Sequence, residues 1–333
     1  MCSSPQQSEK MNNVQETGVM KDLGLNTNED MAPLWRKVWR KLKKVSMLAI
    51  PASVVNSRKV AVVMVSYNRS GKNLENALLT LRNQTIPASQ VDITICDWGS
   101  DDGNVVLLRE MCNRYGARLI LVPSLTSAFS LTRASNVAIR HTPEDADYIL
   151  KTDVDMIFAP NFIEMLVRAG IQFYPSLVMC AAQEISRENA PIAEQKNPVL
   201  KYKEILSSSK LRGGMGMCLC APRQWFFRIH GFDERYILWG HDDDDILKRA
   251  KLDGLHQVGV ADRTSLIHQW HVPATANLEL LTDDERHRRQ EALVANKAIY
   301  IDSMSVSRNL EGWGVEPLGT KVIEPVLGTV KRD

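Results

Sequence analysis

Two aspartates separated by one residue, Asp153 and Asp155, are the first candidates for chemistry in this sequence. Apolar residues precede and follow them in the string Ile-Leu-Lys-Thr-Asp-Val-Asp-Met-Ile-Phe. Two carboxylates are costly to bury among apolar residues unless a cation neutralises them. Because carboxylate oxygens suit hard divalent ions, a metal site is one interpretation. A solvated turn is the other, because this triplet also occurs by chance in many chains.

Two histidines, His268 and His271, follow a later apolar stretch. A histidine is more often a structural residue than a metal ligand. Beside an ion held by aspartate, however, either imidazole is a candidate nitrogen ligand, as in mixed oxygen and imidazole sites for Mn²⁺. The sequence does not decide between the two.

A run of four aspartates, residues 242–245, follows Trp239-Gly240-His241. Acids in a first helical turn stabilise it by roughly 0.3–1 kcal/mol each, but four adjacent like charges repel one another. We therefore expect a nearby cation or a proton-transfer task, such as a general base that deprotonates an acceptor hydroxyl. Trp239 offers a flat apolar face to a sugar ring or an aromatic ligand, and a core position explains it equally well.

Strands and helices alternate in the first half of the chain, and they predict how these residues are positioned. Residues 60–65 form an apolar, β-branched run that is typical of a strand buried on both faces. Leu74, Ala77, Leu78 and Leu81 then share one helical face. The cycle repeats with strands over residues 93–96, 119–122 and 148–150 and helices over residues 105–115 and 130–140.

This alternation predicts an open, mostly parallel α/β sheet. In such sheets ligands bind outside the carboxyl ends of the strands. The segments of interest are therefore residues 66–68, 97–101, 123–124 and 153–155. Past residue 175 the alternation weakens, and a charged helix over residues 283–300 follows.

Several motifs, in order along the chain, resemble those of known glycosyltransferases. Gly213-Gly214, residues 231–234 and residues 239–246 resemble the catalytic half of β-1,4-galactosyltransferases and polypeptide N-acetylgalactosaminyltransferases. Asp153-Val154-Asp155 falls where the family's DxD motif belongs, and family 2 glycosyltransferase signatures are similar to residues 65–69, 97–102 and 133–138. The resemblance covers roughly residues 60–275 and implies the GT-A fold, an α/β fold with a mostly parallel central sheet flanked by helices.

The resemblance also implies roles in donor binding. Tyr67, Asn68 and Asp97 would bind the nucleotide, and Arg133 would lie near the nucleotide or its diphosphate. Gly213 and Gly214 would let the backbone approach the donor sugar.

On the metal side, the resemblance assigns Asp155 and His268 to a Mn²⁺ or Mg²⁺ ion, and Asp153 to the ribose or the same ion. Trp239 would form the floor of the acceptor site. The catalytic base would be Asp243, with Asp242 beside it in the catalytic pair.

Three departures from the family pattern affect donor identity and metal geometry. Trp98 stands where many relatives have a second aspartate. His241 and Asp242 replace the usual Gly-Glu pair, and Ser265 occupies the position of a methionine ligand in the galactosyltransferases.

The resulting prediction is a metal-dependent glycosyltransferase of the hexosyltransferase class. It would move a sugar from a nucleotide-diphosphate donor, with a UDP-sugar as the first candidate, to a carbohydrate or other hydroxyl acceptor. Attack assisted by Asp243 would invert the anomeric centre, and a retaining transferase of the same fold is the main alternative. A sugar-nucleotide nucleotidyltransferase is disfavoured because residues 66–71 are not a glycine-rich basic phosphate loop. A non-catalytic carbohydrate-binding protein is disfavoured by the intact Asp155, Asp243 and His268.

Composition bounds the partners and the location. The 333 residues carry a formal charge of +2, so the chain lacks the overall basic character typical of a nucleic-acid binder. Its six cysteines show neither CxxC nor zinc spacing, which indicates a reducing compartment. Because no signal-peptide pattern and no apolar run near the ~20 residues of a membrane span is present, we expect a cytoplasmic protein, soluble or peripheral at a membrane.

The predicted organisation has four parts. Residues 1–30 are polar and are expected to form a disordered leader. Residues 31–58 comprise a linker and a basic amphipathic helix, residues 34–45, which either contacts an anionic membrane surface or packs on the catalytic domain. Residues 59–280 form the catalytic domain, with a nucleotide-binding half over 59–158 and an acceptor half over 159–280. Residues 281–333 form a C-terminal helix and tail.

Overall fold

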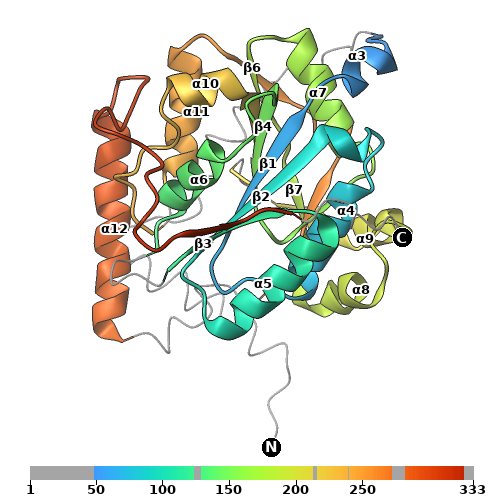
Figure 1. Cartoon of the computed structure of the whole chain (residues 1–333), viewed down its shortest axis with the longest axis horizontal. Helices are drawn as coiled ribbons and strands as arrows, with labels where there is room; N and C mark the ends of the chain where they lie inside the picture. Colours follow the sequence, from blue (N-terminus) through green and yellow to red (C-terminus); the bar gives the residue numbers. More distant parts are fainter. Residues whose placement is uncertain (1–48, 124–128, 213–215, 239, 272–281, 326–333) are drawn as a thin grey trace, which may run out of the picture. The chain divides into compact units, whose positions relative to one another are not determined.

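The structure is a computed structural model that describes residues 49–123, 129–212, 216–238, 240–271 and 282–325 (Figure 1). The chain divides into two units, Met1–Lys44 and Val45–Asp333. All of the described elements belong to the second unit. The predicted leader and the predicted basic helix of residues 34–45 lie outside the described residues.

An eight-stranded sheet with the order β10-β6-β9-β4-β1-β2-β3-β12 runs through the second unit. Its four central strands, β4, β1, β2 and β3, are parallel to one another, whereas β9 and β12 pair antiparallel with β4 and β3. The strands are β1 Val60–Ser66, β2 Val91–Trp98, β3 Arg118–Val122, β4 Tyr148–Thr152, β6 Ser176–Met179, β9 Cys218–Pro222, β10 His256–Gly259 and β12 Lys321–Ile323.

Helices cover both faces of the central strands, which is why β1 reads as a nearly continuous apolar run. Val60, Val62 and Met64 face the core beneath α4 and α5, while α6 packs on the opposite face of β1 and β2. The helices are α3 Ala52–Asn56, α4 Lys72–Arg82, α5 Asp102–Tyr115, α6 Leu131–Arg140, α7 Phe162–Gln172, α8 Ala190–Gln195, α9 Tyr202–Ser207, α10 Arg223–Arg228, α11 Asp242–Leu252 and α12 Asp283–Asp302, with short 3-10 turns at Ala88–Gln90 and Arg187–Asn189.

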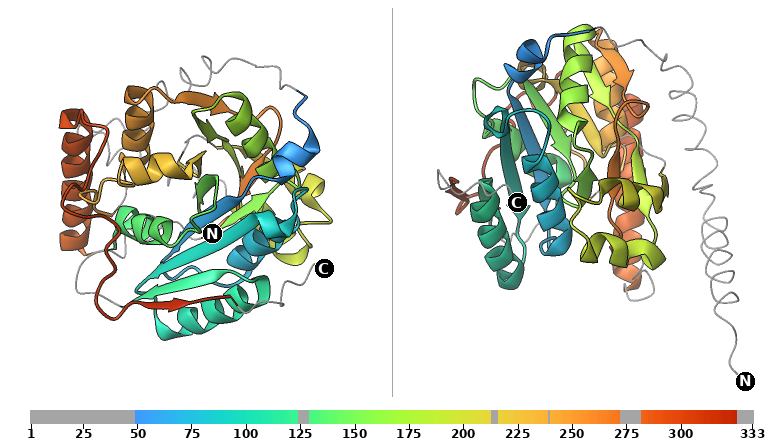
Figure 2. Two further views of the ribbon diagram at one scale, coloured as in Figure 1. Left: turned by 45° about the horizontal axis from the view of Figure 1, so that its top comes forward. Right: turned by 90° about the vertical axis from the view of Figure 1, so that its right-hand side faces the viewer.

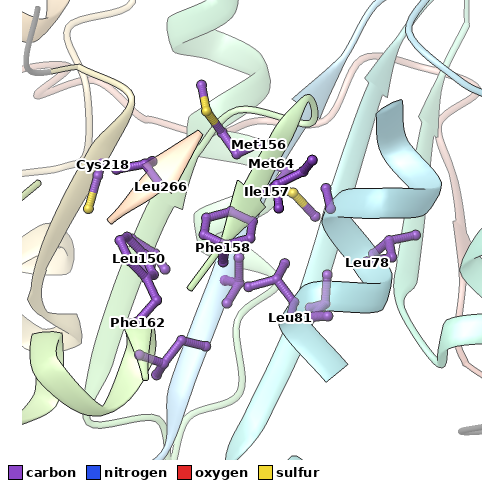
Figure 3. Close-up of a cluster of buried hydrophobic side chains, with 14 of the residues drawn as sticks. Met64, Leu78, Leu81, Leu150, Met156, Ile157, Phe158, Phe162, Cys218 and Leu266 are labelled. Carbon is purple, nitrogen blue, oxygen red and sulfur yellow. The ribbon is translucent and has the colours of Figure 1, made fainter. Parts of the chain in front are cut away.

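A second sheet of four strands, ordered β5-β11-β7-β8, carries part of the chemistry. Its strands are β5 Met156–Phe158, β7 Ala182–Ile185, β8 Ser209–Leu211 and β11 Leu266–His268. The two sheets and α4 share one buried core, in which Met156, Phe158 and Leu266 lie close to Met64 and Leu81 (Figure 3).

The sequence-based strands and helices of the first half are confirmed, and most are longer than predicted, whereas α6 begins one residue later, at Leu131. Capping explains where two helices begin, because the Asp101 carboxylate accepts from the Asn104 N–H before α5, and the Ser130 hydroxyl accepts from the Arg133 N–H before α6. Gly116, in the left-handed region at φ 63°, ends α5.

α12 and the chain after it belong to the same unit as the central sheet. α12 lies beside α11, and β12 adds to the edge of the main sheet at β3 (Figures 1 and 2). The proposed domain boundaries at residues 158 and 280 stay predictions. None of the described helices is long and apolar enough to cross a membrane.

Candidate active site

The site lies at the carboxyl ends of the central parallel strands. Ser66 of β1 pairs in register with Asp97 of β2, and Val63 pairs with Lys151 of β4. Tyr67, Asp97 and Asp153 therefore lie at the carboxyl ends of neighbouring strands, where ligands bind in open α/β folds.

Asp155, His268 and His271 bring three potential ligand atoms within 4.8 Å of one another. His271 Nε2 lies 3.2 Å from Asp155 Oδ2, and His268 Nε2 lies 3.8 Å from Asp155 Oδ1. The strand pair β5 and β11 fixes this geometry, because Met156, which follows Asp155, is the register partner of His268. The backbone N–H of Gln269 also donates to the Asp155 carbonyl at 3.0 Å.

These residues fit a divalent cation. Asp155 is 7% exposed, and its Oδ1 atom is buried with no hydrogen bond within the described residues. Burial favours the neutral carboxyl, but the His271 hydrogen bond and the charges of His268, His271 and Arg69 outweigh it, so the pKa of Asp155 lies below its ordinary value. A carboxylate and two imidazoles suit first-row divalent ions such as Mn²⁺. The sequence left open which of the two histidines is the ligand. In the structure both His268 and His271 lie in positions suited to a metal ligand.

A cluster of acids around one buried lysine forms the neighbouring part of the site. Lys151 Nζ lies 3.3 Å from Asp153 Oδ1, and Lys151 is 3% exposed. Burial alone would lower the pKa of Lys151, but the charges of Asp153, Asp243 and Asp242 raise it above its usual value. Asp153 is thus paired with a cation of the protein, and it is not one of the three converging ligands.

Asp243 has the most perturbed carboxyl of this cluster. Burial, followed by the charge of Asp242, raises the pKa of Asp243 to about 8. Its Oδ1 atom is buried and accepts no hydrogen bond within the described residues. A methyl group added to Gly216 would lie 1.5 Å from Asp243 Oδ2, so only glycine fits beside this carboxylate. Burial likewise raises the pKa of Asp242, whose Oδ1 accepts from the Gly240 N–H at 3.2 Å.

The other two aspartates of the run have structural partners. Asp244 Oδ2 lies 3.2 Å from His241 Nδ1, and the His241 ring stacks on Tyr300 of α12 at 5.5 Å. Asp245, 1% exposed, pairs with Arg249 at 2.8 Å and with Arg308 at 3.3 Å. Three described side chains, Lys151, Arg249 and Arg308, therefore supply the positive charge that the sequence predicts near the aspartate run.

The predicted nucleotide residues lie together at the ends of β1 and β2. The Asn68 N–H donates to Ser100 Oγ at 2.7 Å, and its side chain accepts from the Asp101 N–H. Burial raises the pKa of Asp97 although Ser100 donates to its carboxylate twice. Tyr67, 46% exposed, stacks on Phe129 at 5.2 Å.

Arg133 of α6 lies over the Trp98 ring, with its guanidinium carbon 5.7 Å from the centroid. Its Nε atom is 4.0 Å from Glu234, which places the helix beside the Gly-Phe-Asp-Glu motif. Asn136 fixes that contact, because its amide donates to the Phe232 carbonyl and accepts from the Phe232 N–H. Trp98, which stands where many relatives have a second aspartate, therefore contacts an arginine side chain.

Three predicted residues, Gly213, Gly214 and Trp239, lie outside the described residues. Ser265, at the place of a methionine ligand, shares a hydrogen bond of 2.8 Å with the Tyr202 hydroxyl and is not one of the converging ligands. Lys151, Gly216 and Phe129 were not predicted from the sequence. A lysine inside an apolar strand, two residues before Asp153, was the available signal for Lys151.

Comparisons with known proteins identify the family of this chain. The family model described as glycosyl transferase family 2 matches residues 61–232, more than half of the chain. A second model, described as the N-terminal domain of galactosyltransferase, matches residues 197–271. A search of curated proteins found no significant match.

The described fold resembles that of a solved mannosyltransferase, and further solved structures match with lower scores. The mannosyltransferase PcManGT from Pyrobaculum calidifontis, in complex with GDP-Man and Mn²⁺, is 21% identical with a TM-score of 0.51, over 81% of this chain and 71% of that chain. TarS 1–349 of S. aureus, in complex with UDP-GlcNAc, is 12% identical with a TM-score of 0.49, over 64% of this chain and 59% of that chain. GalNAc-T7 with UDP, GalNAc and Mn²⁺ is 13% identical with a TM-score of 0.49, over 64% and 44%.

The fold and the family match together define a glycosyltransferase of the GT-A type. The chain belongs to glycosyl transferase family 2. The expected fold class and enzyme class are both confirmed.

Proposed function

We propose that this enzyme transfers a sugar from a nucleotide-diphosphate donor to an acceptor hydroxyl in a reaction that needs Mn²⁺ or Mg²⁺. The observation that carries the proposal is the convergence of Asp155, His268 and His271 at the carboxyl ends of the strands. A divalent ion supplies Lewis-acid chemistry at such a site, because it neutralises charge that builds on a leaving diphosphate. Asp153, paired with Lys151, is proposed to contact the ribose or the same ion.

For the nucleotide, we propose contacts with Tyr67, Asn68 and Asp97. The stacked pair of Tyr67 and Phe129 supports this role, since an exposed aromatic surface can stack on a base. Arg133 is proposed to face the diphosphate, and its 42% exposed side chain leaves it accessible. Gly213 and Gly214 remain the proposed contacts for the donor sugar, and Trp239 the proposed acceptor floor.

Asp243 is the proposed general base. In its ionised form it would accept the proton of the acceptor hydroxyl. The oxygen of that hydroxyl would bond in line to the anomeric carbon as the bond from that carbon to the diphosphate oxygen breaks, and the centre would be inverted. Its support is the Oδ1 atom beside Gly216, which has no hydrogen-bond partner within the described residues and so keeps an unused acceptor lone pair. Asp242 holds the start of α11 through Gly240 and keeps negative charge next to the base.

A donor screen tests the proposal. The melting temperature of the full chain is measured with Mn²⁺ and a panel of UDP- and GDP-sugars, and we expect stabilisation by UDP-sugars that EDTA abolishes. ¹H NMR of the first product then reports its anomeric configuration, which we expect to be inverted. Stabilisation by no donor, or equal stabilisation with EDTA, contradicts the proposal, and a retained configuration contradicts the role of Asp243.

We also propose that the basic segment of residues 34–45 binds an anionic membrane surface, since its sequence places Trp and Leu on one face and Lys and Arg on the other. Co-sedimentation with anionic liposomes compares the full chain with a chain that lacks residues 1–50. Equal partitioning of the two contradicts this proposal.

A further inference from the structure

Both nitrogens of the His268 ring have polar neighbours. On one side Nε2 faces Asp155 Oδ1 at 3.8 Å, which is the side of the proposed ion. On the other side Nδ1 lies 2.7 Å from Arg212 Nη1 and 3.6 Å from Glu184 Oε1. Arg212 and Glu184 also pair with each other at 2.8 Å.

The second sheet builds this arrangement. His268 of β11 and Glu184 of β7 are register partners, and Glu184 pairs on its other side with Lys210 of β8. Arg212 directly follows β8, and its backbone N–H donates to the Ala182 carbonyl at 2.9 Å. Two neighbouring strands and the residue that follows β8 thus hold the imidazole, the carboxylate and the guanidinium side by side.

The hydrogen-bond partners determine the tautomer of His268. A guanidinium has N–H donors and no acceptor, so His268 Nδ1 accepts from Arg212. A neutral imidazole that accepts at Nδ1 carries its proton on Nε2. In that form Nε2 has no lone pair for an ion. In the tautomer that accepts from Arg212, the His268 ring therefore cannot coordinate an ion.

An ion on Nε2 requires the opposite tautomer, with the proton on Nδ1 and an acceptor for it. Ligating histidines commonly donate their other N–H to a carboxylate, which fixes the ring. Glu184 Oε1 is that acceptor once its separation from Nδ1 shortens from 3.6 Å to about 3 Å. One proton leaves Nε2 and one binds Nδ1, so the ring stays neutral.

Replacing Arg212 by Glu184 as the partner of His268 Nδ1 requires little free energy. Arg212 and Glu184 have side chains that are 37% and 47% exposed, and exposed pairs of this kind are weak. Arg212 also directly precedes Gly213-Gly214, so the side chain that leaves His268 belongs to the segment proposed to face the donor sugar.

We propose that Arg212 and Glu184 are positioning residues that set the tautomer of His268, Arg212 for the form that cannot bind an ion and Glu184 for the form that binds it. The inference rests on the proposed metal site.

Binding of Mn²⁺, with UDP present, to the full chain tests this proposal, with free Mn²⁺ measured by electron paramagnetic resonance. We expect Glu184→Met to weaken binding about tenfold or more, since loss of such a partner costs 10–100-fold in affinity. Glu184→Gln keeps an acceptor oxygen and should recover much of the loss. Arg212→Met should bind Mn²⁺ more tightly than the wild type, and the exposed Glu188→Met serves as the matched control.

Two outcomes separate this inference from the metal site itself. If the wild type binds no Mn²⁺, the proposed metal site and this inference both fail. If the wild type binds and Glu184→Met binds equally well, only the inference is overturned.

A second measurement reports the tautomer directly. In protein labelled with ¹⁵N-histidine, we expect His268 to carry its proton on Nε2 without an ion and on Nδ1 with Mg²⁺ and UDP. The signal is assigned by its loss in His268→Gln. The same tautomer in both states overturns the proposal, whether or not the variants fold as well as the wild type.

Discussion

At the residue scale, Asp243 is both the proposed general base and a carboxyl whose pKa is raised by burial. If it is the general base, only its ionised form is active, so kcat/KM should rise with pH toward a pKa that lies near 8 before an ion binds. Asp243→Asn removes the base and should lower kcat by roughly 10²–10⁴-fold, with a profile that no longer rises over this range. A variant whose kcat/KM rises with pH as steeply as the wild type contradicts the assignment.

The same carboxyl should make stability depend on pH. An unfolded aspartate has a pKa of about 3.9, whereas that of Asp243 in the folded protein is about 8. Between these values the folded state holds a proton that the unfolded state does not, so stability falls as pH rises. Without metal, the melting temperature of Asp243→Asn should therefore gain on the wild type from pH 5 to pH 8. A constant difference would mean that the pKa of Asp243 is not raised in the folded protein.

Gly216 tests the placement of the base separately from its charge. A methyl group there would overlap Asp243 Oδ2 at 1.5 Å, so Gly216→Ala should displace the carboxylate. We expect kcat to fall about 10²-fold, because a shift of about 1 Å at a reacting group has that effect. Gly103→Ala, where the methyl group meets its nearest atom at 3.4 Å, is the matched control. Equal activity of the two variants contradicts the close contact.

At the element scale, a buried ion network ties α11 to the chain after α12. Arg308, 5% exposed, contacts Asp233 at 3.1 Å and Asp245 at 3.3 Å, and both acids are 1% exposed. Arg308→Met would leave buried carboxylates short of a partner, which typically costs about 3–5 kcal/mol.

Arg235→Met is the comparison for this network, because Arg235 also pairs with Asp233 but its side chain is 57% exposed. Urea unfolding should show a loss well below that of Arg308→Met. If the two variants lose equal free energy of unfolding, the network does not anchor the C-terminal segment.

Elements with local signals were predictable from the sequence. The apolar run of β1 and the caps at Asp101 and Ser130 are set by neighbours in the chain, so strands and helices could be assigned. The insertion of β9 between β4 and β6, and the pairing of β12 with β3, depend on contacts between distant residues. No local pattern at residues 321–323 distinguishes an edge strand from a tail.

At the scale of the whole molecule, the site also combines residues that the sequence predicts with residues that only the folded chain brings together. The resemblance to family motifs predicted roles for Asp155, His268 and Asp243. Their neighbours come from other parts of the chain: Glu184 and Arg212 beside His268, and Lys151 and Gly216 beside Asp243. Such partners become apparent only when the two sheets are assembled.

In the proposed reaction, an ion site at Asp155 and a base at Asp243 act together in sugar transfer. The most direct test measures donor-derived nucleotide diphosphate release with Mn²⁺, alongside melting temperature with Mn²⁺ and UDP, in Asp155→Ala, Asp243→Asn and the exposed control Asp262→Asn. We predict that Asp155→Ala loses both turnover and Mn²⁺-dependent stabilisation, whereas Asp243→Asn loses turnover and keeps the stabilisation. Full turnover in Asp155→Ala or in Asp243→Asn would contradict the proposed roles of the ion site and the base.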